Sequence, residues 1–363
     1  MEKIRIAIAG IGNCASSLIQ GIEYYKNVDE NSGLVPGIIH NTLCGYRISD
    51  IKCVAAFDVD ANKVGKDISK AIFTKPNCAK KFSDVPSKGI IVQRGPLFDG
   101  LGENLRTIIP VDNQREIDVA TVLREEEARI LINFLPTGSK KATEYYAKQA
   151  IKSRCGFINA IPEFIASTTK WRDKFSKARL PLVGDDIKSQ LGATTLHRSL
   201  VDLFLKWGCK INETHQSNLG GNTDFLNLIE PSRAKTKIIC KSEAIKKNIP
   251  YLVPVTIDIK SHKKEHEPTL GDTKRTIIHV EGMNFGSMPI SIDVGLRVED
   301  SPNSAGVMVD VIRAMKVSLD RGDSGVIDPI CSQFFKRPAI PLNDNQAFKN
   351  FELYVDMKKA LEE

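Results

Sequence analysis

The first fifteen residues restrict the fold more than any other part of the chain. An apolar strand is expected at residues 3–9, and Gly10-Ile11-Gly12-Asn13-Cys14-Ala15 follows it, before a helical segment at 16–25. In this GxGxxA pattern, Gly10 permits a tight turn, Gly12 lets the backbone approach a pyrophosphate, and Ala15 lets the helix pack close to the strand. The strand before the motif and the helix after it are the context that the motif requires. The N-terminus therefore predicts the first unit of a dinucleotide-binding fold.

A second strand supplies the acidic residue that such folds use to bind ribose. The acid would normally follow about 20 residues after the glycines, but residues 26–50 contain several glycines and a proline and indicate an inserted loop. The next strand is expected at 51–57 and ends at Asp58. We expect Asp58 to bind the ribose hydroxyls of NAD, which is favoured over NADP because no arginine follows immediately. The alternative is that Asp58 only caps a helix at 61–71.

Strands and helices alternate up to about residue 205. This alternation predicts an α/β fold with a Rossmann-like, doubly wound parallel sheet. The loop from Pro136 through Gly138 to Ser139 comes at the end of one strand and would border the nicotinamide side of a dinucleotide site. Further strands are expected at 89–92, 129–135, 155–160 and 180–183, with helices at 119–128, 141–152, 167–178 and 195–204.

The pattern changes after residue 205. Three strands then follow one another without helices between them, which indicates a second, α+β domain with a mixed or antiparallel sheet. The predicted domains are an NAD-binding domain of residues 1–205 with 300–363, and a catalytic and oligomerisation domain of residues 206–299. The elements expected after residue 205 are strands at 210–219, 251–259, 276–282 and 290–299, and helices at 229–248, 304–320 and 346–362.

Charge and composition exclude several classes of function. The formal charge is +7 over 363 residues, and no basic run is interleaved with aromatic residues, so we expect no nucleic-acid partner. No stretch approaches the roughly 20 apolar residues of a membrane helix, and the N-terminus has no signal-peptide cleavage site. We therefore expect no membrane partner and a cytoplasmic location. The eight cysteines show neither CxxC nor metal-ligand spacing and are expected to be reduced thiols.

Polar residues gather where the expected strand at 180–183 ends. Asp185, Asp186, Ser189 and Gln190 precede the start of a helix. A helix N-terminus favours an anion because of its free N–H groups and its dipole, and the serine and the glutamine can add donors. The two carboxylates would repel a phosphate unless they face a cation or a cofactor amide. The alternative is a capped helix with two solvated acids.

Six strings along the chain do not follow from generic fold constraints. They are Gly12–Ser17, Ile90–Pro96, Asn159–Ser167, Gly184–Gln190, Asn218–Asn227 and Asp300–Gly306. Together they resemble inositol-1-phosphate synthases of the bacterial and archaeal type. The resemblance implies an NAD-dependent isomerase that converts D-glucose 6-phosphate into 1D-myo-inositol 3-phosphate. That reaction oxidises carbon 5, forms an enolate at carbon 6, closes the ring by aldol attack on carbon 1, and reduces carbon 5 with the same NADH.

The resemblance also implies roles for individual residues. Lys237 and Lys336 would handle protons at the C5 hydroxyl, Lys274 would hold the phosphate and the oxyanion region, and Lys241 would hold the phosphate. Asp186 would touch the nicotinamide and hold a lysine, while Asp224 and Asp300 would orient lysines or substrate hydroxyls. The residues expected to bind the substrate phosphate with Lys241 are Ser189, Gln190 and Gly192. The residues expected to bind NAD are Gly10, Gly12, Asn13, Cys14, Asp58, Pro136, Gly138 and Asp185.

Several alternatives stay open at this level. The chain could be an NAD-linked dehydrogenase that oxidises a sugar phosphate or polyol, or a non-catalytic NAD-binding regulator or scaffold. A divalent or monovalent cation beside the NAD phosphates also stays open, with ligands that the sequence does not specify. We expect His262, His266 and His279 to be loop and strand residues, because no closed ligand set accompanies them. The resemblance suggests a homotetramer built through the sheet of the second domain.

Overall fold

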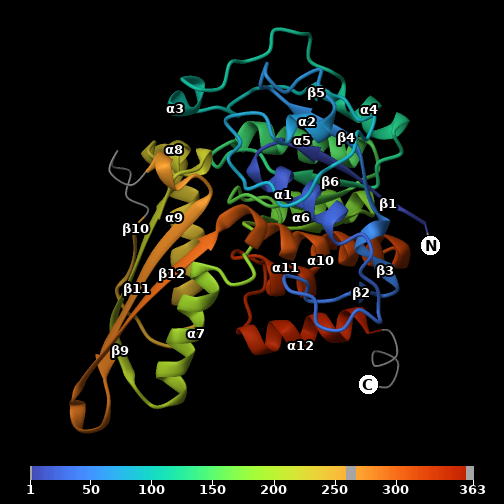
Figure 1. Cartoon of the computed structure of the whole chain (residues 1–363). Helices are drawn as coiled ribbons and strands as arrows, with labels where there is room; N and C mark the ends of the chain where they lie inside the picture. Colours follow the sequence, from blue (N-terminus) through green and yellow to red (C-terminus); the bar gives the residue numbers. More distant parts are fainter. Residues whose placement is uncertain (1, 259–266, 357–363) are drawn as a thin grey trace.

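The computed structural model describes residues 2–258 and 267–356 (Figure 1). Its larger sheet has seven parallel strands in the order β13-β8-β7-β6-β1-β4-β5, which confirms the expected doubly wound α/β fold. The strand order reverses on either side of β1, the arrangement that creates a ligand-binding crevice at the carboxyl ends of the strands. The strands are β1 (Ile4–Ala9), β4 (Ile51–Asp58), β5 (Val92–Arg94), β6 (Ile130–Asn133), β7 (Gly156–Asn159), β8 (Pro181–Val183) and β13 (Gly325–Val326).

Alternate residues of β1 enter two separate cores, one on each face of the sheet. Ile4, Ile6 and Ile8 pack in the core that contains α1 (Asn13–Tyr24) and α10 (Asp300–Arg321). Ala7 and Ala9 pack in the other core. Because successive side chains of a strand point to opposite faces, a strand buried on both faces is apolar throughout. The helices of the second core are α4 (Val119–Glu125), α5 (Lys140–Lys152) and α6 (Thr169–Ala178).

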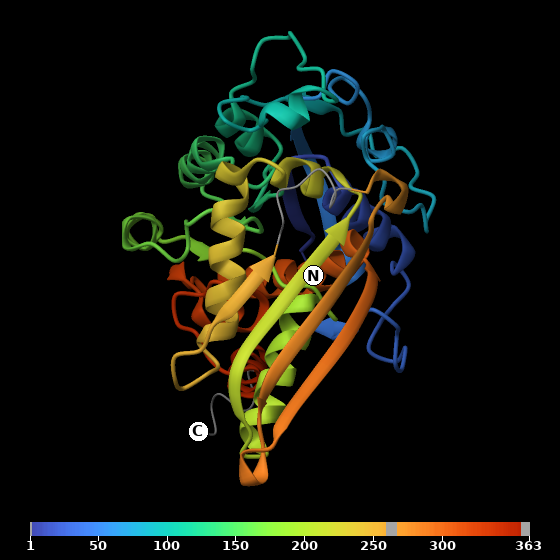
Figure 2. The same ribbon diagram turned by 90° about the vertical axis from the view of Figure 1, so that its left-hand side faces the viewer.

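The second sheet is mixed, which is one of the two arrangements that the sequence predicted. Its order is β10-β9-β11-β12, in which only β10 and β9 run parallel. The strands are β9 (Lys210–Gly220), β10 (Val255–Asp258), β11 (Thr273–Met283) and β12 (Pro289–Glu299). Two helices, α7 (Ala193–Lys206) and α9 (Pro231–Lys246), pack on its inner face. The other face of the sheet is turned to the viewer in Figure 2, with α7 behind it.

The chain passes between the two regions at two places. β12 runs directly into α10 at Asp300, so α10 carries the chain from the second sheet back to the first core. α7 was expected in the first domain, but it packs on β9 and β11 of the second sheet. We therefore propose that the second domain begins near residue 193 rather than residue 206 and ends at residue 299.

Short elements fill the connections, and some differ from expectation. The expected helix at 61–71 is reduced to α2 (Ile68–Ala71), because the Asp67 carboxylate caps it and starts it there. The expected strand at 89–92 is displaced to β5, where it pairs with the end of β4. Residues 259 and 357–363, which were expected to end a strand and a helix, lie outside the described residues. The remaining strands and α-helices are β2 (Thr42–Leu43), β3 (Tyr46–Arg47), α3 (Glu103–Arg106), α8 (Thr223–Leu228), α11 (Asp328–Phe334) and α12 (Asp344–Val355).

No helix in the described ranges combines the length and the apolar character needed to cross a bilayer.

Candidate active site

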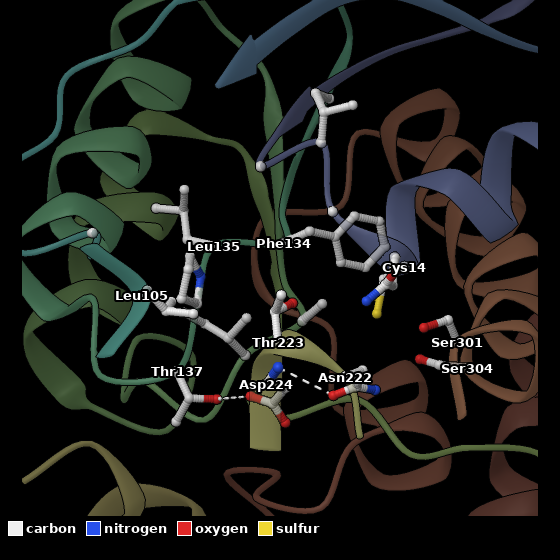
Figure 3. A pocket seen from close by; sticks show the side chains of 18 of the residues that line it. Cys14, Leu105, Phe134, Leu135, Thr137, Asn222, Thr223, Asp224, Ser301 and Ser304 are labelled. Atoms are coloured by element: carbon white, nitrogen blue, oxygen red, sulfur yellow. Dashed lines mark hydrogen bonds between the residues drawn. The ribbon is translucent and has the colours of Figure 1, made fainter. Parts of the chain in front are cut away.

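A cleft opens at the carboxyl ends of β1, β4 and β6, where the order of the parallel strands reverses. It encloses about 1510 Å³ of space, including its open mouth. One side is formed by the loops after β1 and β6 and by the end of β4, and the other by α8, α9, β11 and the start of α10. Figure 3 shows side chains of α1, α8 and α10 around it. The cleft therefore lies between the parallel sheet and the second sheet.

The turn after β1 has the geometry of a dinucleotide-binding loop. Gly10 has a φ of +91°, and a Cβ atom there would lie 2.7 Å from the carbonyl oxygen of Phe134, so only glycine fits. A Cβ atom on Gly12 would meet no protein atom within 4 Å, and Gly12 lines the cleft. The Asp58 carboxylate accepts the N–H of Ile11 at 2.7 Å and the N–H of Val59 at 2.7 Å. The loop thus keeps open the space that a pyrophosphate and a ribose would need.

Three lysines in the cleft are each paired with a carboxylate. Lys336 Nζ lies 2.7 Å from Asp186 Oδ1, and Lys274 Nζ lies 3.1 Å from Asp300 Oδ1. Lys237 Nζ donates to Asp224 Oδ2. All six residues line the cleft, and so does Lys241. The structure thus brings together all seven residues that the sequence proposed as catalytic.

A short run of backbone hydrogen bonds places Asp186 opposite Lys336. The Lys336 N–H donates to Asp186 O at 2.8 Å, and the Lys188 N–H donates to Phe334 O at 2.8 Å. These bonds tie the turn after β8 to the segment after α11. Asp186 itself has a φ of +62°, a conformation that few non-glycine residues adopt. Its Oδ2 atom is buried and has no hydrogen-bond partner among the described residues.

Asp224 is fixed from three directions. Thr137 Oγ1 donates to its Oδ1 at 3.1 Å, and its own N–H donates to Asn222 Oδ1 at 3.1 Å (Figure 3). Lys237 donates to its Oδ2. Asn222 caps α8, which was not expected from the sequence. Lys237 and Lys241 lie one turn apart on α9, which confirms that they share a helical face.

The neighbouring charges move the pKa values of Lys237 and Lys241 in opposite directions. Burial lowers the pKa of Lys237, but Asp224, Asp186 and Asp300 outweigh it and leave that pKa above the ordinary lysine value. Burial also lowers the pKa of Lys241, and Lys274, Lys237 and Lys336 lower it further, so it lies well below the ordinary value. Lys237 is therefore an ammonium in the ligand-free protein, whereas protonation of Lys241 is disfavoured.

Four expected ligand residues do not line the cleft. Asp185 is fully buried, and its carboxylate accepts from Asn159 Nδ2 and from the N–H groups of residues 165–167. Gln190 Nε2 donates to Gly37 O at 2.6 Å, away from the cleft. Gly138 packs against Arg233, and Gly192 is the N-cap of α7. We therefore do not keep Asp185 as an NAD ligand: its oxygens already have donors, and they hold the loop after β7. Ser189, in contrast, lines the cleft.

Sequence reasoning missed a group of residues that holds the site together. The Asp272 carboxylate accepts from Asn222 Nδ2 at 2.9 Å, from the Ser301 N–H at 3.0 Å and from Ser301 Oγ at 2.9 Å. It thereby joins the start of α8 to the start of α10. Burial and the nearby Asp300 raise the pKa of Asp272 to about 6. Asn222 and Ser301 lie inside the strings 218–227 and 300–306, and this position could have indicated that they belong to the site.

The structure gives no support to a cation site. No group of three or more His, Cys, Asp or Glu side chains with metal-binding geometry occurs among residues 2–258 and 267–356. His279 lies on β11, where its Nδ1 is 2.8 Å from Asp293 Oδ1 of β12. His262 and His266 lie outside the described residues.

Curated relatives cover nearly the whole chain. An inositol-3-phosphate synthase of Mycolicibacterium smegmatis is 43% identical, over 98% of this chain and 98% of the relative. An inositol-3-phosphate synthase of Corynebacterium glutamicum is 44% identical, over 97% of this chain and 98% of the relative. The family model for myo-inositol-1-phosphate synthase matches residues 192–301, the region that contains α8, α9 and the second sheet.

Solved structures agree at the level of the fold. The crystal structure of Ari2 is 30% identical, with a TM-score of 0.77, and the match covers 99% of this chain and all of the other. A myo-inositol-1-phosphate synthase-related protein from Thermotoga maritima is 24% identical, with a TM-score of 0.79 over 98% of both chains. The identity to the curated relatives over nearly the whole chain shows that it belongs to the myo-inositol-1-phosphate synthase family.

Proposed function

We propose that this enzyme converts D-glucose 6-phosphate into 1D-myo-inositol 3-phosphate, with NAD as a cofactor that is regenerated in every cycle. The observation that supports this most is a group of residues in one cleft, next to a dinucleotide-binding turn. The group consists of Lys237, Lys241, Lys274, Lys336, Asp186, Asp224 and Asp300. The family membership supports the same reaction, because several relatives are named inositol-3-phosphate synthase.

The residues of the cleft fit NAD. Gly10, Gly12, Asn13 and Cys14 would lie along the pyrophosphate, and Asp58 would accept from the ribose hydroxyls. Asp186 Oδ2 would accept from the carboxamide of the nicotinamide, since it is a buried oxygen without a donor among the described residues. Pro136 also lines the cleft. When bound, NAD supplies the acceptor for the hydride of carbon 5 and returns that hydride at the end.

Lys237 and Lys336 would move the proton of the C5 hydroxyl. Oxidation at carbon 5 requires that this hydroxyl lose its proton, and the later reduction requires that the proton return. Each lysine lies in an ion pair, with Asp224 or Asp186, so an ammonium there would first pass its own proton to that carboxylate and then accept the proton of the C5 hydroxyl. One lysine can therefore serve both halves of the cycle.

Lys274 and Lys241 would face the negative charge of the substrate. Proton removal at carbon 6 gives an enolate, and its attack on the carbon 1 aldehyde gives an alkoxide. Positively charged groups fixed beside such oxyanions stabilise them strongly in a site shielded from water. Lys274 is fixed by Asp300 and would serve this role. Lys241 and Ser189 would bind the phosphate, because both line the same cleft.

A single assay tests this proposal. Purified protein is incubated with glucose 6-phosphate and NAD+, while NADH absorbance and periodate-releasable phosphate are followed. We expect inositol phosphate to accumulate without NADH. NADH in amounts equal to the sugar phosphate consumed would indicate a dehydrogenase instead. Bound NAD with neither product would contradict the substrate assignment and favour a regulator or a different sugar phosphate.

We also propose that the enzyme is a cytoplasmic homotetramer assembled through the outward face of the second sheet. Ile277 lies on this face with 60% of its surface exposed, and Figure 2 shows the face turned outward. Substitution of Ile277 by lysine would place a charge in such an interface. Light scattering should then report smaller particles than for the unmodified protein, and an unchanged mass would contradict the proposed interface.

A further inference from the structure

Lys241 differs from Lys237, Lys274 and Lys336 in its partner. Within the described part of the chain its Nζ has one hydrogen-bond acceptor, the amide oxygen of Asn218, at 3.2 Å. The residue is only 3% exposed. Burial of an ammonium without a carboxylate is costly, and a lysine in this setting tends to be uncharged.

The orientation of the Asn218 amide is set by its neighbours. Three donors converge on Asn218 Oδ1: Lys241 Nζ, Gln216 Nε2 at 2.9 Å and Thr276 Oγ1 at 3.2 Å. Its Nδ2 donates to the backbone oxygen of Asp258. The amide therefore presents its oxygen, not its N–H group, to Lys241.

A buried histidine, His197, contacts Gln216 on the side away from Asn218. Gln216 Oε1 lies 3.3 Å from His197 Nδ1, and His197 Nε2 lies 2.6 Å from Thr214 Oγ1. Because Gln216 uses its N–H group toward Asn218, its amide oxygen faces His197. Burial lowers the pKa of His197 to about 4. The hydrogen-bonded side chains that connect α7 to Lys241 are therefore uncharged near pH 7.

Most of the charges around Lys241 oppose a further positive charge. Lys274 from β11, Lys237 from α9 itself and Lys336 from the segment after α11 all lower its pKa, and Asp186 raises it less than burial and these lysines lower it. Asp300 of α10 and Asp224 of α8 also lie in the cleft, but they pair with Lys274 and Lys237. The three other lysines thus already have their counter-charges, and Lys241 has none of its own.

We propose that Lys241 is uncharged in the protein without substrate, because its partner Asn218 brings no counter-charge, and that it takes up one proton from solvent when a phosphomonoester dianion binds in the cleft. The proton goes to Nζ, and the resulting ammonium faces the phosphate. This inference rests on the proposed function in one respect, that the cleft binds a sugar phosphate. It adds that binding is coupled to protonation, which a preformed cluster of four ammonium groups would not show.

The coupling has a defined sign. If the complex holds one more proton than the free components, affinity must fall as pH rises. The dissociation constant should increase by up to tenfold per pH unit between the pKa of Lys241 in the free protein and its pKa in the complex. The phosphomonoester itself, whose second pKa is about 6, is already a dianion at pH 8.

The test uses calorimetric titration of the NADH-loaded protein with D-glucitol 6-phosphate at pH 8. This open-chain alditol phosphate has no carbonyl for NADH to reduce. Binding enthalpies in buffers of different ionisation enthalpy give the number of protons taken up. We expect close to one proton per site for the unmodified protein. Lys241→Met should bind more weakly and take up none. Asn218→Asp should still bind the ligand but take up no proton, because its carboxylate would keep Lys241 protonated before the ligand binds.

Each contrary result has its own meaning. Binding of D-glucitol 6-phosphate without proton uptake by the unmodified protein would overturn this inference and leave the proposed function standing. Proton uptake that persists in Lys241→Met would overturn it as well, since another group would then be the acceptor. Failure of the unmodified protein to bind D-glucitol 6-phosphate at all would instead overturn the sugar-phosphate assignment, and this inference with it.

Discussion

Lys336 and Asp186 are joined twice, once through their side chains at 2.7 Å and once through a backbone hydrogen bond from the Lys336 N–H to Asp186 O at 2.8 Å. The two residues are 150 positions apart in the sequence. The backbone bond fixes where the two chains lie, so the side-chain pair does not depend on flexible lysine rotamers alone. Asp186 also keeps its second carboxylate oxygen without a donor among the described residues.

Asp186→Asn should therefore lower both turnover and cofactor affinity. The substitution removes the charge that holds the Lys336 ammonium and one carboxylate acceptor for the nicotinamide amide. Loss of a hydrogen bond to a charged group costs about 1.5–3 kcal/mol, so we expect the Kd for NAD to rise about 10- to 100-fold. Turnover should fall by at least about 10²-fold. Fluorescence titration measures the first and the inositol phosphate assay the second.

Asp320→Asn is the matched control for this prediction. Asp320 pairs with Lys316 on α10, outside the cleft. We expect it to leave NAD affinity and turnover unchanged. Equal losses in both variants would show that the effect of Asp186→Asn comes from general destabilisation and not from the site.

Lys237→Ala should abolish turnover while NAD still binds. Lys237 hydrogen-bonds to Asp224, so its loss should fall on proton transfer at carbon 5. Removal of such a group typically costs about 10²–10⁴-fold in rate. Lys235→Ala, on the exposed side of the same helix, is the control and should retain full activity. If Lys237→Ala retained normal turnover, Lys237 would not be the proton carrier.

Gly12→Ala should affect the ligand and not the fold. Gly12 has a φ of −90°, which alanine adopts readily, and its added Cβ would meet no protein atom within 4 Å. The methyl group would instead stand where we place the pyrophosphate. We expect the thermal midpoint of the free protein to stay unchanged and the Kd for NAD to rise at least tenfold. Gly21→Ala, in the same helix and also in open space, should change neither NAD affinity nor activity. Unchanged NAD affinity in Gly12→Ala would contradict the cofactor position.

The local parts of the site could be predicted from the sequence. The turn at Gly10, the end of β4 at Asp58 and the shared face of Lys237 and Lys241 all follow from spacing within one element or between adjacent elements. The partner of each lysine could not be predicted from spacing, because the pairs join distant segments. Lys274 meets Asp300 only because β11 and β12 pair in one register and α10 starts where β12 ends.

Asp185 and Asp186 show why adjacent residues of one type need not act alike. Nothing in their spacing separates them, and the sequence suggested that both contact the cofactor. In the structure, donors from Asn159 and from the loop after β7 surround the Asp185 carboxylate. Asp186 has a positive φ, and its own side chain lines the cleft. That difference depends on the tertiary position of residues 159–167, which no local pattern encodes.

Glu163 is a buried acid outside the cleft that should make stability depend on pH. The residue is 4% exposed, and its Oε1 accepts from the Gly138 N–H at 3.1 Å and from Thr236 Oγ1 at 3.3 Å. Burial raises the pKa of Glu163 to about 7, from an ordinary value of 4.5. A raised pKa means that the folded state holds the proton more tightly than the unfolded state. The stabilising contribution of that proton is complete below about pH 4.5 and is lost as pH rises through about 7.

Glu163→Gln should remove this dependence, because the amide oxygen can accept the same two hydrogen bonds and carries no titratable proton. The free energy of unfolding of the variant, relative to the unmodified protein, should therefore rise between pH 5 and pH 8. The pKa difference sets an upper limit of about 3 kcal/mol, and we expect a gain of about 1–3 kcal/mol. Urea unfolding of the ligand-free protein at both pH values measures it. Glu125→Gln, at an exposed position on α4, should show no such change. A relative stability of Glu163→Gln that stayed flat from pH 5 to pH 8 would mean that Glu163 is already ionised in the folded protein, with a cation or a solvent path that balances its charge.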